Sequence, residues 1–169
     1  MTTANLLKPR PKEQPMDNGI EDQPRVELAR AMSRALADSY MLSLKTQYCH
    51  WNVVGPLFYS LHQLTEAQYQ DLFSAIDDLA ERIRALGAVA PGSLQAFSKL
   101  SDIQEFIDRP SAEDMVRELA QDHETCARRM RLVVDAADAA GDVKTADILT
   151  ERIGQHEENV WMLRAILTH

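Results

Sequence analysis

Residues 50–56 of the chain form the segment His50-Trp51-Asn52-Val53-Val54-Gly55-Pro56. This segment separates two long stretches in which apolar side chains recur at steps of three and four residues, the periodicity of an amphipathic helix. Gly55 and Pro56 end the first stretch, because glycine favours non-helical backbone and proline restricts the residue before it. The pattern therefore predicts one helix over residues 25–52 and a second over residues 58–86.

The remainder of the chain predicts a long connection and two more helices. Residues 87–110 are too long for a tight loop between packed helices, and we expect a short helix at residues 94–100 within them. Ser111 is a suitable N-cap for a third helix that runs to residue 140, and a fourth helix follows over residues 142–167. Because the long connection lets the second and third helices run parallel, we predict an all-α, ferritin-like four-helix bundle whose crossover carries a short helix.

The composition is that of a single soluble domain. The chain has 169 residues, of which 45% are hydrophobic and 26% are charged. No stretch approaches the ~18 consecutive apolar residues of a membrane span, and the N-terminus lacks a secretory pattern, so we expect a cytoplasmic protein with no membrane partner. Cys49 and Cys126 form no Cys-x-x-Cys pair, which argues against a disulfide framework or a thiolate zinc site.

The charge balance argues against nucleic-acid binding by the body of the protein. Eighteen Lys and Arg against 26 Asp and Glu give a net charge of −8, the wrong sign for neutralising phosphates. Residues 1–24 contain four prolines and little apolar surface, so we expect a mobile arm ahead of a bundle domain at residues 25–169. The arm carries Lys8, Arg10 and Lys12, but these three basic residues are outnumbered by four acidic ones.

The second predicted helix carries side chains of the types that bind iron. Imidazole and carboxylate groups occur at His62, Glu66, Asp77 and Glu81. Helical geometry sets all of them within about 100° of one another around the helix axis. Asp77 and Glu81 are four residues apart and can bind one ion together. His62 and Asp77 are fifteen residues apart, or about 22 Å along the axis, so one chain cannot bring both to one metal.

A second copy of the chain would overcome this separation. If the second helix meets its own copy antiparallel about a two-fold axis near Gln70, His62 of one subunit faces the carboxylates of Asp77 and Glu81 in the other. His50 can return beside His62 across the intervening turn. The spacing therefore predicts two equivalent metal sites per dimer, each with two imidazoles from one subunit and two carboxylates from its mate.

A di-iron site inside one bundle, of the kind that Glu-x-x-His pairs form in standard ferritins, is not expected. None of the five histidines follows a glutamate by three residues. The residues at that position are Gln47, Tyr59, Ala120, Ile153 and Ile166. His123 and His156 have no partner at ligand spacing and His169 ends the chain, so we interpret these three histidines as structural or solvated.

The chain from residue 26 to its end resembles the Dps (DNA-protection-during-starvation) mini-ferritins. The resemblance rests on residues 50–56, on Phe58 and Leu61-His62, and on the run Asp77-Asp78-Leu79-Ala80-Glu81-Arg82-Ile83. It implies a hollow dodecamer that oxidises ferrous iron, preferably with hydrogen peroxide, and stores the product inside as ferric mineral. It also implies a mono-iron or di-iron site formed by His50, His62, Asp77 and Glu81, with Glu66 as an acidic auxiliary ligand.

Two further sets of residues have alternative interpretations. Trp51 either packs in the core or acts as an electron donor beside the metal site. Asp138, Asp142 and Asp147 are either solvated caps around the turn into the fourth helix or, as the resemblance implies, the lining of a three-fold pore that attracts iron. The function has an alternative too, because some members of the family coat DNA, and the basic residues of the arm would serve a nucleoid-binding architectural protein.

Overall fold

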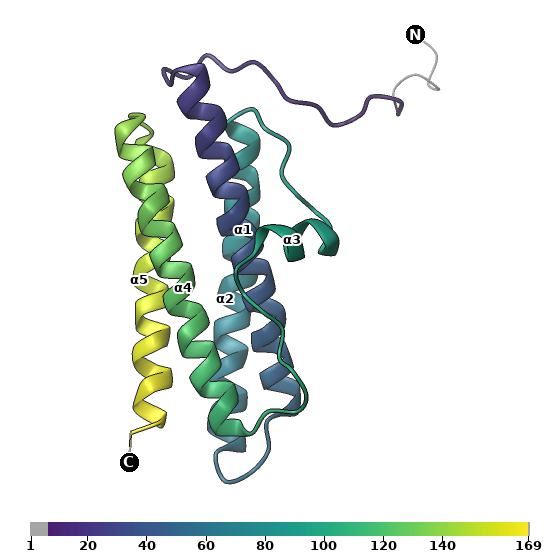
Figure 1. Ribbon diagram of the computed structural model, residues 1–169, viewed down its shortest axis with the longest axis vertical. Coiled ribbons are helices and arrows are strands. Elements are labelled where there is room, and N and C mark those ends of the chain that lie inside the picture. The colour runs from purple at the N-terminus through teal and green to yellow at the C-terminus, as the bar shows by residue number, and fades with distance from the viewer. Residues whose placement is uncertain (1–6, 169) are drawn as a thin grey trace.

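The computed structural model describes residues 7–168, and these residues form five helices and no strand. The helices are α1 (Asp22–Asn52), α2 (Phe58–Ala85), α3 (Leu94–Leu100), α4 (Ala112–Ala139) and α5 (Val143–Ile166). Four long helices lie side by side, and the short α3 lies against the flank of α1 (Figure 1). The predicted all-α four-helix bundle and its short crossover helix are confirmed.

The crossover sets the direction of the helices. It returns along the length of the bundle, so α2 and α4 run in the same direction while α1 and α5 run in the opposite one (Figure 1). Phe97 of α3 is buried and stacks on Tyr40 of α1, with 4.4 Å between the ring centroids. The crossover is therefore a packed part of the bundle.

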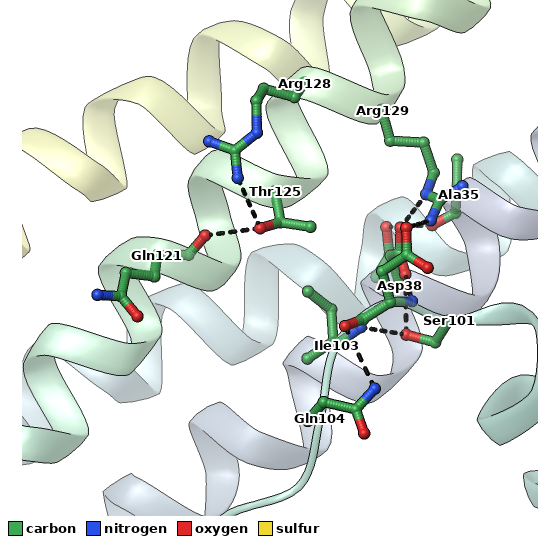
Figure 2. Close-up of polar contacts among 11 residues, drawn as sticks. Ala35, Asp38, Ser101, Ile103, Gln104, Gln121, Thr125, Arg128 and Arg129 are labelled. Atoms are coloured by element: carbon green, nitrogen blue, oxygen red, sulfur yellow. Dashed lines mark hydrogen bonds and ion pairs between the residues drawn. The ribbon is translucent and has the colours of Figure 1, made fainter.

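Asp38 on α1 joins the segment that directly follows α3 to α4 (Figure 2). Its side chain is fully buried, and its Oδ1 accepts hydrogen bonds from Ser101 Oγ at 2.8 Å and from the backbone N–H of Asp102 at 2.7 Å. Its Oδ2 accepts from Arg129 of α4, which also pairs with the carboxylate of Asp102. A buried carboxylate is stable only when its oxygens are paired in this way.

The caps expected at the helix ends are present. Ser111 Oγ accepts a hydrogen bond from the backbone N–H of Asp114 at 3.1 Å, and Asp142 Oδ1 accepts from that of Thr145 at 3.0 Å. Gly87, after α2, has a φ of +88°, in the left-handed region that favours glycine. These contacts satisfy backbone groups that a helix leaves unpaired at its ends.

The start of α1 differs from the predicted domain boundary. The helix begins at Asp22, three residues before residue 25, because a proline such as Pro24 is tolerated in the first turn, where its missing N–H is not needed. Ahead of it, Gln14 donates its backbone N–H to the carbonyl of Gly87 at 2.8 Å. This part of the predicted arm therefore contacts the bundle, whereas residues 1–6 and His169 lie outside the described residues.

Both cysteines are buried free thiols. Burial raises the pKa of Cys49 to about 12, so its thiol stays protonated and unreactive near neutral pH. None of the helices in the described part of the chain is both long enough and apolar enough to cross a bilayer.

We predict that Asp38→Ala lowers the free energy of unfolding by about 3–5 kcal/mol, the cost of removing one partner of a buried ion pair. Asp102→Ala is the matched control: its side chain is 58% exposed, so we expect a loss of about 1 kcal/mol or less. Urea unfolding followed by circular dichroism, at one fixed protein concentration, compares the two variants. Equal losses would show that Asp38 does not anchor the crossover.

Candidate metal centre

Two imidazole rings meet where the last turn of α1 faces the first turns of α2. The rings of His50 and His62 stack with their centroids 3.8 Å apart. His50 Nδ1 lies 2.9 Å from the backbone oxygen of His62, and His62 Nδ1 lies 2.8 Å from the backbone oxygen of His50. Because a carbonyl oxygen only accepts, each Nδ1 must carry a proton. In the neutral ring each Nε2 then has a free lone pair, the form in which histidine binds a metal ion.

Aromatic side chains hold this imidazole pair from both sides. The ring of Phe58 stacks on His62 with 5.2 Å between centroids, and the ring of Tyr69 meets His50 edge-on at 5.3 Å. Backbone hydrogen bonds and ring contacts together fix the direction of both Nε2 atoms. The turn at Gly55, where φ is +102°, brings the two histidines together as predicted.

Trp51 adjoins the imidazole pair but does not belong to the core. Its side chain is 64% exposed, and it lines an apolar cavity of about 280 Å³ together with Tyr48 and Phe106. Core packing within the subunit is therefore wrong as an account of Trp51. An exposed indole next to His50 is compatible with the second interpretation, in which it donates an electron.

The carboxylates stay apart from the histidines within one subunit. Asp77 and Glu81 are both exposed on α2, and none of the ion pairs among the described residues involves either of them. Glu66 is half-buried one turn after His62. Across residues 7–168 no group of three or more His, Cys, Asp or Glu side chains is close enough to hold a metal ion. A single subunit therefore brings together the two imidazoles only.

One of the three predicted pore residues, Asp142, is already paired with side chains of its own subunit. Asp142 is buried, and its carboxylate accepts hydrogen bonds from Thr145 and from Arg82, whose Nη2 lies 2.6 Å away. Burial acts to raise the pKa of Asp142, but these hydrogen bonds outweigh it and hold the pKa below its usual value. Asp142 is thus a helix cap joined to α2, and its prediction as a pore residue is corrected. Arg82 was not predicted to have this role.

The other two predicted pore residues remain available. Asp138 and Asp147 are exposed, and Asp147 pairs with Lys144 at 2.8 Å on the surface. An exposed pair of this kind constrains a carboxylate only weakly.

His123 and His156 are buried and not solvated. Of the two predicted alternatives, the structural one is therefore confirmed for both. Both are fully buried, and their Nδ1 atoms lie 2.8 Å apart. Burial lowers the pKa of His123 to about 3 and also holds the pKa of His156 well below its usual value, so both rings are neutral at pH 7. Their position among the apolar residues of α4 and α5 was the available signal, but periodicity alone does not pair residues from two helices.

Comparison with known proteins finds a matching family model and sequence relatives. The model of the ferritin-like domain family matches residues 29–169. The chain is 34% identical over 140 residues to a DNA protection during starvation protein of Brevibacillus brevis, covering 83% of this chain and 94% of that protein. It is 45% identical over 151 residues to an uncharacterized low temperature-induced protein of Nostoc, covering 88% and 84% of the two chains.

Solved structures agree with the sequence relatives. The crystal structure of a Dps protein from Bacillus brevis has a TM-score of 0.84 and 33% identity, over 86% of this chain and 98% of that one. The Dps protein of Vibrio cholerae, described as a member of a broad superfamily of ferritin-like diiron-carboxylate proteins, has a TM-score of 0.86 and 29% identity, over 94% and 100% of the two chains.

Proposed function

This chain belongs to the Dps family of ferritin-like proteins, and from that membership we propose that it oxidises ferrous iron at sites shared between two subunits and stores it as ferric mineral. Relatives named for DNA protection, and the diiron-carboxylate superfamily, support a role in iron storage and DNA protection. The observation that carries the proposal is the imidazole pair of His50 and His62, whose Nδ1 hydrogen bonds leave both Nε2 atoms free for a metal.

The other half of each proposed site comes from a second subunit. An antiparallel copy of α2, related by a two-fold axis near Gln70, would bring Asp77 and Glu81 opposite the imidazole pair. Phe73, one turn from that axis, is 70% exposed in the single subunit. Burying such a side chain contributes about 1.5–3 kcal/mol, which favours the docking of two copies on this face.

Each residue of the proposed site has a role in the oxidation. Two neutral imidazoles and two carboxylates bind ferrous iron, and the two negative charges favour the higher charge of the ferric product. Hydrogen peroxide accepts the electrons and leaves as water, which removes both reactants of hydroxyl-radical formation together. Glu66 is proposed as an auxiliary ligand on the way to the mineral. Trp51 is proposed to supply an electron when oxidising equivalents remain.

We predict that His50→Ala and Asp77→Ala each slow ferrous oxidation by about 100-fold or more, because removing a ligand exceeds the 10–100-fold loss typical of outer-shell partners. Asp78→Ala is the matched control, since Asp78 is an exposed neighbouring carboxylate outside the proposed ligand set. Ultraviolet absorbance after addition of ferrous iron, with peroxide and oxygen compared, measures the rates, and circular dichroism checks the helices.

A mixed dimer tests whether the site is shared. One chain lacks both histidine ligands and its mate lacks both carboxylates, so that one complete site and one empty site remain if the ligands come from different subunits. If the site is shared, we expect the mixed dimer to oxidise iron at about half of the parental rate. A mixed dimer as inactive as one without any ligand would exclude it.

The proposed assembly is a hollow homododecamer whose three-fold pores attract iron. With Asp142 occupied by Arg82, the pore proposal rests on Asp138 and Asp147, which would place six carboxylates around each channel. Carboxylates along a path with low-dielectric walls concentrate cations at its mouth.

We predict that Asp138→Asn/Asp147→Asn slows oxidation at limiting iron and flattens its dependence on ionic strength, because the attraction of the pore is removed. Dimers prepared from the same variant should keep the parental rate, since their sites face solvent. The control is Asp135→Asn, an exposed carboxylate about one turn before the end of α4 whose loss should change little. Parental rates and salt dependence in the double variant would contradict the pore.

Coating of the nucleoid is a second proposed function, and it rests on the arm. Lys8, Arg10 and Lys12 are all exposed and precede Gln14, which is bonded to the bundle. About twelve arms on one particle would strengthen weak contacts with DNA.

We predict that removing residues 1–12, which spares the Gln14 contact, leaves assembly and iron oxidation unchanged and lowers affinity for DNA. Gel shifts at several salt concentrations measure the binding, and the control is a chain in which only these three basic residues are replaced by glutamine. Unchanged binding by both variants would assign any DNA contact to the body of the particle.

A further inference from the structure

The interior of the bundle contains a group of polar side chains that do not satisfy one another. Among the described residues, eight buried side-chain atoms have no hydrogen-bond partner, and five of them belong to four side chains of α2, α4 and α5. These atoms are Gln68 Nε2 and Oε1, His123 Nε2, His156 Nε2 and Asn159 Nδ2. Each of the four residues is at most 2% exposed. We call these four residues the core polar cluster.

The members of the cluster lie within about one helical turn of one another along the bundle. His123 and His156 are joined through their Nδ1 atoms, and Asp71 on α2 holds Arg152 on α5 through two hydrogen bonds of 2.6 and 3.0 Å. Gln68 is about 4.5 Å along α2 from Asp71, and His156 is about 6 Å along α5 from Arg152. Because α2 and α5 run in opposite directions, Gln68 and His156 both lie on the same side of the Asp71–Arg152 pair along the bundle (Figure 1).

Unpaired atoms at this depth are unfavourable. A buried donor or acceptor without a partner loses its hydrogen bonds to water and gains nothing in return, so nearly all such atoms in folded proteins are paired with protein or with a bound molecule. Five of them in one core would offset a large part of the stability of a small domain. The cluster therefore requires a bound molecule, here called the guest, that can both donate and accept hydrogen bonds.

The chemistry of the histidine pair determines the charge of that guest. Both rings are neutral, so in the Nδ1 contact one nitrogen donates and the other accepts. One Nε2 then carries a proton and the other a lone pair, whereas a metal ion shared by both would need two lone pairs. The charged side chains that act on the histidine pair are Arg152 and Asp71, which are paired with each other. A cation is therefore disfavoured.

We propose that the core polar cluster is a binding site for uncharged molecules that carry hydroxyl groups, namely water or hydrogen peroxide. A buried water makes about three hydrogen bonds, so five unpaired atoms require two guest oxygens. Two waters meet this requirement, and so does one peroxide, which has two oxygens that both donate and accept. This site is separate from the proposed iron centre, whose imidazoles come from the last turn of α1 and the first turns of α2.

Crystallography of the full-length assembled protein tests the proposal directly. Crystals are measured untreated and after brief exposure to hydrogen peroxide, with anomalous data at the iron and zinc edges. We expect two peaks without anomalous signal at about 2.7–3.1 Å from the Nε2 atoms and Gln68. A covalent separation between the peaks after exposure identifies peroxide, and a hydrogen-bond separation identifies water. An anomalous peak, or reoriented side chains that pair with one another, would overturn the proposal.

Two substitutions provide a test in solution. His156→Gln keeps a donor and an acceptor, whereas His156→Leu keeps a similar volume and leaves the other cluster members and their guest without partners. We expect the melting temperature of the leucine variant to fall several degrees further than that of the glutamine variant, with loss of the guest peaks only in the former. Equal melting temperatures would mean that the site responds to volume alone, and would contradict a hydrogen-bonded guest.

Discussion

A straight α-helix is a rigid spacer, and this property of α2 determines how the protein can work. His62 and Asp77 are separated by fifteen residues, or about 22 Å of helix, and no bend brings them together. The imidazole pair is complete in one subunit, while the carboxylates remain exposed and unpaired elsewhere on the same helix. The proposed chemistry therefore depends on assembly, because only a second copy can supply the missing ligands.

Two pairs of histidines differ in what their Nδ1 atoms contact. In the pair at His50 and His62, each Nδ1 is bonded to a backbone carbonyl, so both rings adopt the same tautomer and both Nε2 atoms are free. In the pair at His123 and His156, the Nδ1 atoms are bonded to each other, so the rings must adopt different tautomers. The first arrangement suits a metal ion and the second suits an uncharged guest, although all four side chains are chemically identical.

The backbone of the long crossover needs hydrogen-bond partners, and a buried charged residue supplies them. Joining two parallel helices requires a segment that returns along the bundle, and its backbone must find partners away from regular structure. Asp38 supplies them by accepting hydrogen bonds from Ser101 and Asp102 while pairing with Arg129 on α4. This anchor also fixes α1 against α4, the helix that carries one member of the core polar cluster.

The helices and the candidate ligands were predictable from the sequence, because they depend on local periodicity and on spacing along one helix. The apolar period, the turn at Gly55 and the cap at Ser111 predicted helix positions to within a few residues. The long-range partners of Asp38, Asp142 and His123 were not predictable, since each comes from a segment at least 33 residues away. A linear pattern shows which face of a helix is apolar, but the opposing residue depends on how two helices are rotated and shifted against each other, and only tertiary packing decides that.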